Sequence, residues 1–206
     1  YEVKKVENIG GTKSLKIDQI RALAPDLIVA NKEENEKAQL EELAKEFPVY
    51  LSDITNISSS YKMIEDVATL TGTIKQGNEL LKSLSGGFSS LPKYSGTVAY
   101  LIWFKPIMVS ASQTFIHDVL NHLGFDNAFA NNKRYPELSF EDLSSKNPDY
   151  IFLSSEPFPF KEKHIEIIKE HCPKAKVILV DGEMFSWYGS RMLKAIEYFK
   201  ELGTQL

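Results

Sequence analysis

The sequence predicts an α/β fold in which two lobes are joined by one long helix. The first observation behind this prediction is an internal repeat, because Leu15–Val29 aligns without gaps on Leu138–Phe152. Each copy has the pattern of a short amphipathic helix with an acid in its first turn, then Pro-Asp, then an apolar run typical of a buried parallel strand. The second observation is the intervening segment Ser59–Leu84, which carries apolar residues at helical spacing.

The composition is that of a folded globular chain and excludes several classes of protein. Of 206 residues, 43% are hydrophobic, and 24 basic against 28 acidic side chains give a net charge of −4. No basic tract is present, so the sequence does not favour nucleic-acid binding. No apolar run approaches the ~20 residues of a membrane-spanning helix. The single cysteine, Cys172, excludes an internal disulfide and a multi-cysteine metal site.

The first lobe, residues 1–57, is predicted to be only partly present. Its expected elements alternate between helix and strand, beginning with a helix: Ser14–Leu23, Leu27–Ala30, Glu34–Phe47 and Val49–Leu51. Two parallel strands are too few to hold a core, since three or more strands are usually needed. We therefore expect this lobe to be incomplete.

A single helix over residues 58–86 is predicted to join the lobes. Serines at its start supply N-caps, and Ser85-Gly86-Gly87 ends it. At ~1.5 Å per residue such a helix is about 40 Å long. A connection of this kind leaves little freedom for a hinge closure between the lobes.

The second copy of the repeat predicts a complete three-layer lobe over residues 87–189. Its expected elements are strand Thr97–Trp103, helix Thr114–Leu123, a turn at Gly124–Asn127, the helix of the repeat, strand Tyr150–Leu153, helix Lys161–His171 and strand Lys176–Val180. A last helix within residues 190–206 opens at Ser190, and we expect it to pack back on the first lobe. Both lobes are thus predicted to be Rossmann-like.

Several motifs, taken in order along the chain, resemble those of one protein family. They are Gly10-Gly11-Thr12, Ile17–Ile20, Pro25–Ile28, Tyr100–Trp103, Thr114–Leu120 and Gly189-Ser190-Arg191. The chain resembles the helical-backbone (class III) substrate-binding proteins of ATP-binding-cassette (ABC) importers, the group that carries cobalamin, ferric siderophores or haem. Members of that group begin with a strand, a helix and a second strand before the Gly-Gly loop, and this sequence departs from them there.

The resemblance implies a ligand in the cleft between the lobes, against the loops that follow the strands, where open α/β sheets generally bind. Trp187-Tyr188 stands where many members carry an arginine or a proline-rich stretch, which leaves the identity of the ligand open. The residues implied as ligand contacts are Gly11, Thr12, Trp103, Phe104, Arg134, Tyr135, Glu156, Phe158, Glu183, Phe185, Trp187 and Tyr188.

For several of these residues, a purely structural role fits the sequence about as well as a ligand contact. Trp103 also fits the last core residue of a buried strand. Arg134 and Tyr135 also fit an ordinary solvated loop. Phe158 and Phe160 could merely cap the core beneath the following helix, and for Phe160 that interpretation is favoured.

Two acids are implied as contacts to the importer. Asp18 and Glu141 occupy equivalent places in the two copies of the repeat, and the resemblance implies that acids at these positions dock onto arginines of the membrane subunits. We expect the two carboxylates to lie on one face, one per lobe. The alternative is that each acid only complements the dipole of its own helix, an effect of about 0.3–1 kcal/mol.

The sequence carries no pattern of a catalytic or metal centre. It has no G-x-S-x-G elbow, and Gly10-Gly11-Thr12 lacks the further glycines or the lysine of a nucleotide loop. His117 and His122 are five residues apart and face different sides of their helix, so we expect no metal ligands from the protein. Any metal should arrive inside an organic chelate.

We therefore expect a binding protein without enzymatic activity or intrinsic cofactor. It would capture a corrinoid, a ferric siderophore or haem and deliver it to the membrane subunits of an ABC importer. No leader segment is visible at Tyr1, so its expected place in the periplasm or cell envelope rests on the resemblance. The main alternative is a Rossmann-like enzyme acting on a nucleotide-linked substrate, and a third is an interaction module that keeps the fold.

Overall fold

The computed structural model describes residues 6–206, so the first five residues of the predicted first lobe lie outside the described part. The chain forms two compact units, of which the first ends at Ile54 and the second runs from Thr55 to Leu206. This boundary is close to the predicted end of the first lobe at residue 57. Each unit has its own buried apolar residues.

The first unit is a small α/β layer beside a short hairpin. Parallel pairing joins β3 to β4 from Ile28 opposite Val49 to Asn31 opposite Ser52. Arg21 on α1 pairs with Glu42 on α2 and with Glu46 just beyond it, which ties the two helices together. The elements are β1 (Gly10–Gly11), β2 (Ser14–Leu15), α1 (Ile17–Leu23), β3 (Ile28–Asn31), α2 (Lys37–Leu43) and β4 (Val49–Ser52).

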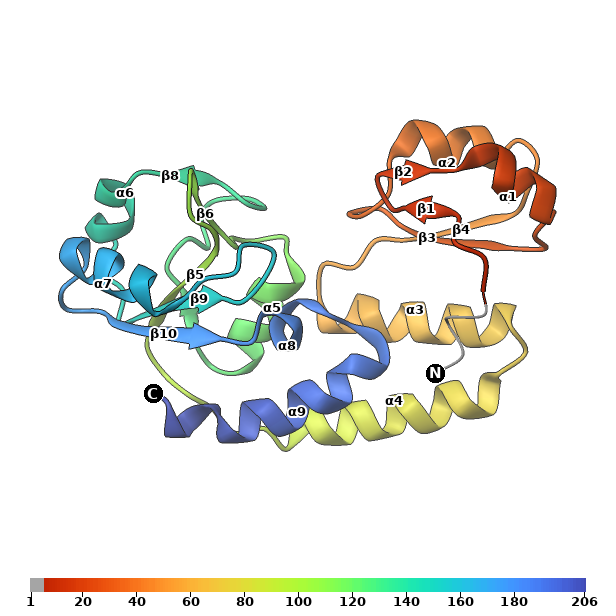
Figure 1. The fold of residues 1–206 in the computed structure, drawn as a ribbon. Coiled ribbons are helices and arrows are strands. Elements are labelled where there is room, and N and C mark those ends of the chain that lie inside the picture. Colours follow the sequence, from red (N-terminus) through yellow and green to blue (C-terminus); the bar gives the residue numbers. More distant parts are fainter. Residues whose placement is uncertain (1–5) are drawn as a thin grey trace. The chain divides into compact units, whose positions relative to one another are not determined.

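The second unit opens with a helical hairpin, and here the sequence-based prediction of one long helix was wrong. Helix α3 (Ile57–Leu70) and helix α4 (Ile74–Ser89) run back along each other (Figure 1). The chain reverses at Gly72, whose φ of 68° lies in the left-handed region that glycine adopts without strain. Gly77 lets the helices approach, because a Cβ there would lie 2.5 Å from Cβ of Ala68.

A mixed sheet forms the centre of the second unit. Its strand order is β10-β9-β5-β6-β8, with β7 also paired to β5. Strands β10, β9, β5 and β7 are parallel neighbours, whereas β6 and β8 run antiparallel. The strands are β5 (Thr97–Trp103), β6 (Ile107–Val109), β7 (Asp126–Asn127), β8 (Glu137–Leu138), β9 (Tyr150–Ser154) and β10 (Lys176–Val180).

Helices cover both faces of this sheet, which confirms the predicted three-layer lobe. Alternate residues of a strand face opposite sides. On one side, Leu101 and Ile151 belong to a core with Leu143 of α6 and Ile168 of α7. On the other side, aromatic rings of the strands pack against α8 and α9. The helices are α5 (Phe115–His122), α6 (Phe140–Ser145), α7 (Glu162–His171), α8 (Gly182–Ser186) and α9 (Met192–Glu201).

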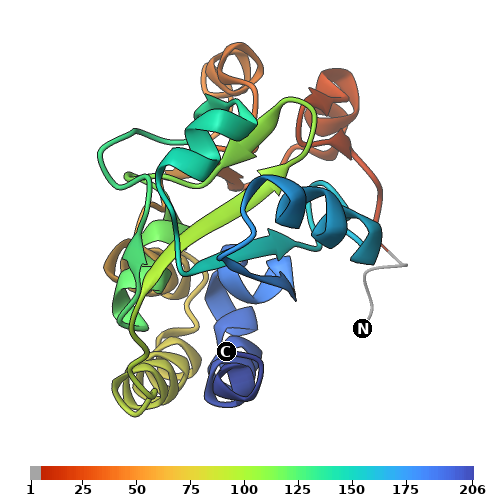
Figure 2. The same ribbon diagram turned by 90° about the vertical axis from the view of Figure 1, so that its left-hand side faces the viewer.

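The last helix packs against helices of the second unit, whereas we expected it to pack back on the first lobe. Helix α9 follows a 3₁₀ turn at Gly189–Arg191 and lies against α4 and α8. Figure 2 looks along α4 and α9, which lie side by side. The glycine at position 87 makes this possible, because any side chain there would collide with Ile196.

The internal repeat is present in the structure. Helices α1 and α6 begin at equivalent residues, Ile17 and Phe140, and each is preceded by a two-residue strand at the same place. In the second copy the Pro-Asp acid has a clear role: Asp149 accepts hydrogen bonds from the backbone N and the hydroxyl of Thr97, at 2.7 and 2.9 Å. These bonds lower the pKa of Asp149 and fasten the start of β5 to the start of β9.

Candidate functional site

The carboxyl ends of three neighbouring parallel strands form the edge on which the candidate site lies. Strand β9 lies between β10 and β5, so the loops that follow these strands leave the sheet side by side. The sequence places four aromatic or acidic side chains and a cation at the ends of these strands or in the segments that follow them. We call this group the carboxyl-edge cluster: Trp103, Glu156, Phe158, Trp187 and Arg191.

Trp103 lies on the surface at the end of β5. Its side chain is 39% exposed, and its Nε1 donates a hydrogen bond of 3.1 Å to the carbonyl oxygen of Lys105. The indole meets Phe158 edge-on at 5.7 Å between ring centroids. Trp103 is therefore not the closing residue of the core, and its role as a ligand contact stays a prediction.

Phe104 was predicted as a ligand contact, but the structure places it in the core. It is only 8% exposed and packs among Phe140, Phe158 and Phe160. The sequence could not distinguish it from Trp103, because Phe104 lies in the turn after β5, where no regular alternation sets the direction of a side chain. Phe160 is buried, as favoured from the sequence.

Beneath Phe158 lies a buried histidine. His164 is surrounded by Phe104, Phe158 and Phe160, with ring centroids 4.9, 5.2 and 5.5 Å away. Its Nδ1 accepts a hydrogen bond from the backbone N of Lys161 at 2.8 Å. Burial, together with the charge of nearby lysines, lowers the pKa of His164, so the ring is held neutral.

Trp187 is held from two sides. It is 50% exposed, and its Nε1 donates a hydrogen bond of 2.6 Å to Oε1 of Glu156, which also accepts one from the hydroxyl of Ser186 at 3.0 Å. The guanidinium of Arg191 lies over the indole, 5.6 Å from the ring centroid, and forms an ion pair with Glu183. Glu183 is thus connected to the Trp187 ring through Arg191.

The remaining aromatics of this loop have different roles. Phe185 was predicted as a ligand contact, but it is fully buried, with its ring 5.1 Å from that of Tyr100 and 4.9 Å from that of Phe199. The loop forms the short helix α8, capped by Asp181, and a helix turns every third or fourth residue inward. Tyr188 is half-buried and packs edge-on against Phe115 at 5.6 Å.

Arg134 and Tyr135 are positioned by a different part of the sheet. Arg134, with a left-handed φ of 60°, exchanges backbone hydrogen bonds with Ala111 and Ser112, which follow β6. Its guanidinium lies 5.6 Å from the centroid of the Tyr135 ring. These two residues are therefore placed by the antiparallel part of the sheet and not by the loops of the carboxyl-edge cluster.

Two predicted contacts belong to the first unit. Gly11 and Thr12 form the exposed turn of the β1–β2 hairpin, and the carbonyl oxygen of Thr12 accepts a hydrogen bond of 3.1 Å from the side chain of Asn35. The two acids implied as importer contacts both lie in the first turn of their helices with exposed side chains. Asp18 also pairs with Arg21 at 3.4 Å, and Glu141 belongs to α6.

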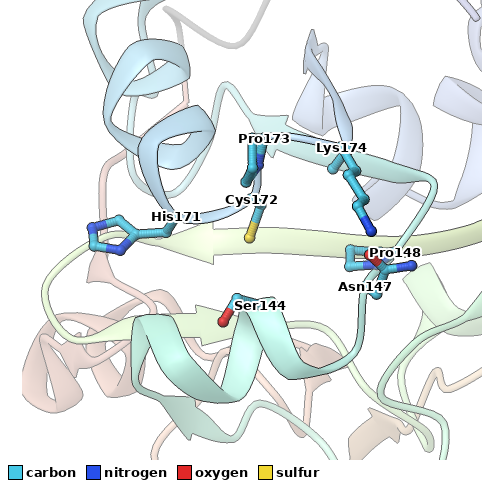
Figure 3. Close-up of a pocket in the computed structure, with 8 residues that line it drawn as sticks. Ser144, Asn147, Pro148, His171, Cys172, Pro173 and Lys174 are labelled. Carbon is cyan, nitrogen blue, oxygen red and sulfur yellow. The ribbon is translucent and has the colours of Figure 1, made fainter.

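A separate pocket lies at the opposite edge of the sheet. Figure 3 shows it between the end of α6 and the segment that leads into β10, and its volume is about 120 Å³. Cys172 is buried in its wall, and burial raises the pKa of the thiol, which makes it a weak nucleophile. Among residues 6–206 no three His, Cys, Asp or Glu side chains are grouped to hold a metal ion.

Sequence reasoning gave no role to Arg191 or Ser186, although both help to shape the site. Arg191 belongs to one of the motifs that carry the family resemblance, and this was the one sign in the sequence of a role at the site. Its contact with Trp187 depends on the 3₁₀ turn at Gly189–Arg191, which the sequence did not predict.

Comparison with known proteins places the chain in a family. The profile of the periplasmic binding protein family matches residues 1–174. The chain belongs to the periplasmic binding protein family. Within that family it is 27% identical over 161 residues to the vitamin B12-binding protein of Vibrio parahaemolyticus, a match that covers 74% of this chain. The chain spans 58% of the length of that relative.

Two further proteins match over nearly the whole chain. An uncharacterised ABC transporter substrate-binding lipoprotein of Bacillus subtilis is 24% identical, over 97% of this chain and 68% of the relative. The solved structure of a periplasmic haem-binding protein, in complex with two haems, superposes with a TM-score of 0.80 at 18% identity, over 98% of this chain and 82% of that one. This likeness establishes a two-lobed α/β fold for the chain.

Proposed function

We propose that this binding protein captures a bulky metal complex, such as a corrinoid, haem or a ferric siderophore, against the carboxyl-edge cluster and delivers it to an ABC importer. The observation that carries the proposal is the pair of half-exposed tryptophans, Trp103 and Trp187, on loops that follow two strands of one parallel sheet. Tryptophan is enriched at binding interfaces, because its large apolar ring gains much from being covered.

Membership of the family supports the proposed location and partner of the protein. Its relatives include an ABC transporter substrate-binding lipoprotein and a vitamin B12-binding protein, which supports a place outside the cytoplasm and a role in import. In the described part of the chain, no helix has the length and apolar character needed to cross a membrane. Asp18 and Glu141 are the proposed contacts to the importer, since each projects from the first turn of an equivalent helix.

Fluorescence titration tests the proposed ligand class. The chain has two tryptophans, so Trp103→Phe and Trp187→Phe each leave a single reporter. Cyanocobalamin, haemin and ferrichrome are titrated into the wild type and both variants. Saturable quenching of both reporters by one of these complexes is the expected result. The proposal would be contradicted if none of the three complexes quenched the tryptophan fluorescence or released heat on binding in calorimetry.

A further inference from the structure

The starting point is the way in which Trp187 is fixed. A tryptophan on a surface loop has two free side-chain torsions, and holding them costs conformational entropy that a ligand would otherwise have to offset. In this chain the indole N–H is bonded to a carboxylate oxygen of Glu156 at 2.6 Å. That hydrogen bond is charge-assisted and therefore stronger than one between neutral groups.

Arg191 fixes the same ring from a second direction. Its guanidinium lies over one face of the indole, the geometry of a cation–π contact, and its own position is set by the ion pair with Glu183. One face of the ring is therefore covered by a cation from the protein. The face away from Arg191 is the one available to a ligand.

We propose that Glu156 and Arg191 are positioning residues that hold Trp187 as a one-sided stacking platform for a flat ring system. This inference rests on the proposed binding function and deepens it. Because Glu156 occupies the indole N–H, the platform presents a π face and no hydrogen-bond donor. A π face without a donor favours a flat macrocycle over a compact ferric chelate, which offers no extended ring to stack on the indole.

The first experiment needs no ligand. In the Trp103→Phe background, Trp187 is the only tryptophan, so its fluorescence anisotropy decay and its quenching by acrylamide report on that ring alone. We expect a rigid, partly shielded indole. Glu156→Ala should release it, giving faster local depolarisation and more quenching, whereas Glu156→Gln keeps an acceptor and should restore the rigid signal. Glu166→Ala, an exposed acid on α7, is the matched control.

Arg191 is tested in the same background. Arg191→Met retains a long apolar stem over the ring but removes the charge, and Arg191→Ala removes both. The Nε of Arg191 is buried without a hydrogen-bond partner among the described residues, so its replacement breaks no hydrogen bond at that atom. Replacement does take the ion-pair partner away from Glu183, so the stability of both variants is measured alongside the fluorescence. We expect acrylamide quenching to be weakest in the Trp103→Phe parent, stronger with Arg191→Met and strongest with Arg191→Ala.

Binding then distinguishes this inference from the proposed function. With cyanocobalamin and haemin as flat probes and ferrichrome as a compact one, Glu156→Ala should weaken binding of a flat probe about tenfold and Glu156→Gln by less than about twofold. An unchanged anisotropy and quenching of Trp187 in Glu156→Ala and Arg191→Ala would overturn the positioning role whether or not a probe binds. A released indole with no binding of any probe would support the positioning role and contradict the proposed function. Preference for ferrichrome would overturn the assignment to a flat ring.

Discussion

Ala24 and Asn147 hold the same left-handed backbone conformation at equivalent places in the two copies of the repeat, with φ of 45° and 43°. Each follows its helix and precedes a proline, Pro25 or Pro148. An alanine in this region strains its Cβ against the backbone, whereas asparagine visits it more readily. The two copies therefore share one turn geometry, although asparagine adopts the left-handed conformation with less strain than alanine does.

Exchanging these two residues should change stability in opposite directions. Ala24→Asn should raise the free energy of unfolding, and Asn147→Ala should lower it, each by up to about 1 kcal/mol. Urea denaturation followed by circular dichroism measures both. The control is Ala22→Asn inside α1, where asparagine is a poorer helix former and should destabilise by about 0.5 kcal/mol. Loss of stability in Ala24→Asn, or no loss in Asn147→Ala, would contradict the explanation by backbone conformation.

The close contact between Gly77 and Ala68 predicts a coupled pair of substitutions. Gly77→Ala forces two methyl groups together and should cost about 1–3 kcal/mol of stability, despite the better helix propensity of alanine. Adding Ala68→Gly should recover much of that loss, because the double variant restores one methyl group at the contact. A double-mutant cycle in urea gives the coupling free energy. Additive effects of the two changes would show that the helices do not meet there.

The buried His164 predicts a loss of stability in mild acid. Its pKa is lowered from the ordinary 6.5 in the folded protein, so the unfolded state binds more protons below that pH. Stability from this group is complete above pH 6.5 and falls as the pH drops towards the folded pKa. Thermal melts between pH 7.5 and 5 should show the fall, and His164→Gln should reduce it. Burial also lowers the pKa of His117, so His117→Gln should reduce the fall in stability as well. Comparing the two variants separates the contributions of the two histidines.

Charge reversal at the repeated acids should separate transport from binding. We expect Asp18→Lys with Glu141→Lys to leave ligand affinity almost unchanged and to abolish uptake by the cognate importer in vesicles, with a partial effect of each single change. A double variant with the same change in net charge, Glu79→Lys with Glu166→Lys, should transport normally, because those acids lie on α4 and α7. Uptake at the wild-type rate by the first double variant would mean that the acids only stabilise their own helices.

The sequence predicted the strands of the second unit well and its helical connection poorly. Strands β5 and β10 begin and end where the apolar runs do, because a buried parallel strand has few alternatives at those residues. The hairpin of α3 and α4 was missed because apolar residues repeat with the same period on both arms of a hairpin as along one helix. Only Thr71-Gly72-Thr73 signalled the reversal, and a lone glycine also occurs inside helices.

For the candidate site, the sequence identified the loops better than the side chains that face outward. Trp103 and Trp187 are exposed and so remain candidate ligand contacts, whereas the neighbouring Phe104 and Phe185 are buried. Which member of such a pair faces outward depends on the local pleat or helical turn. Arg191 acquires its role from a contact between loops, which no local pattern encodes.

The turn at Gly72 has a practical consequence for following this protein in solution. A Cβ at Gly72 would have no atom within 4 Å, and the neighbouring Leu70 is half exposed. The native thiol, Cys172, is buried and its pKa is raised, so it reacts slowly with alkylating dyes. A reporter attached through Leu70→Cys would therefore label one place, at the tip of the hairpin, without touching the sheet edge that carries the tryptophans.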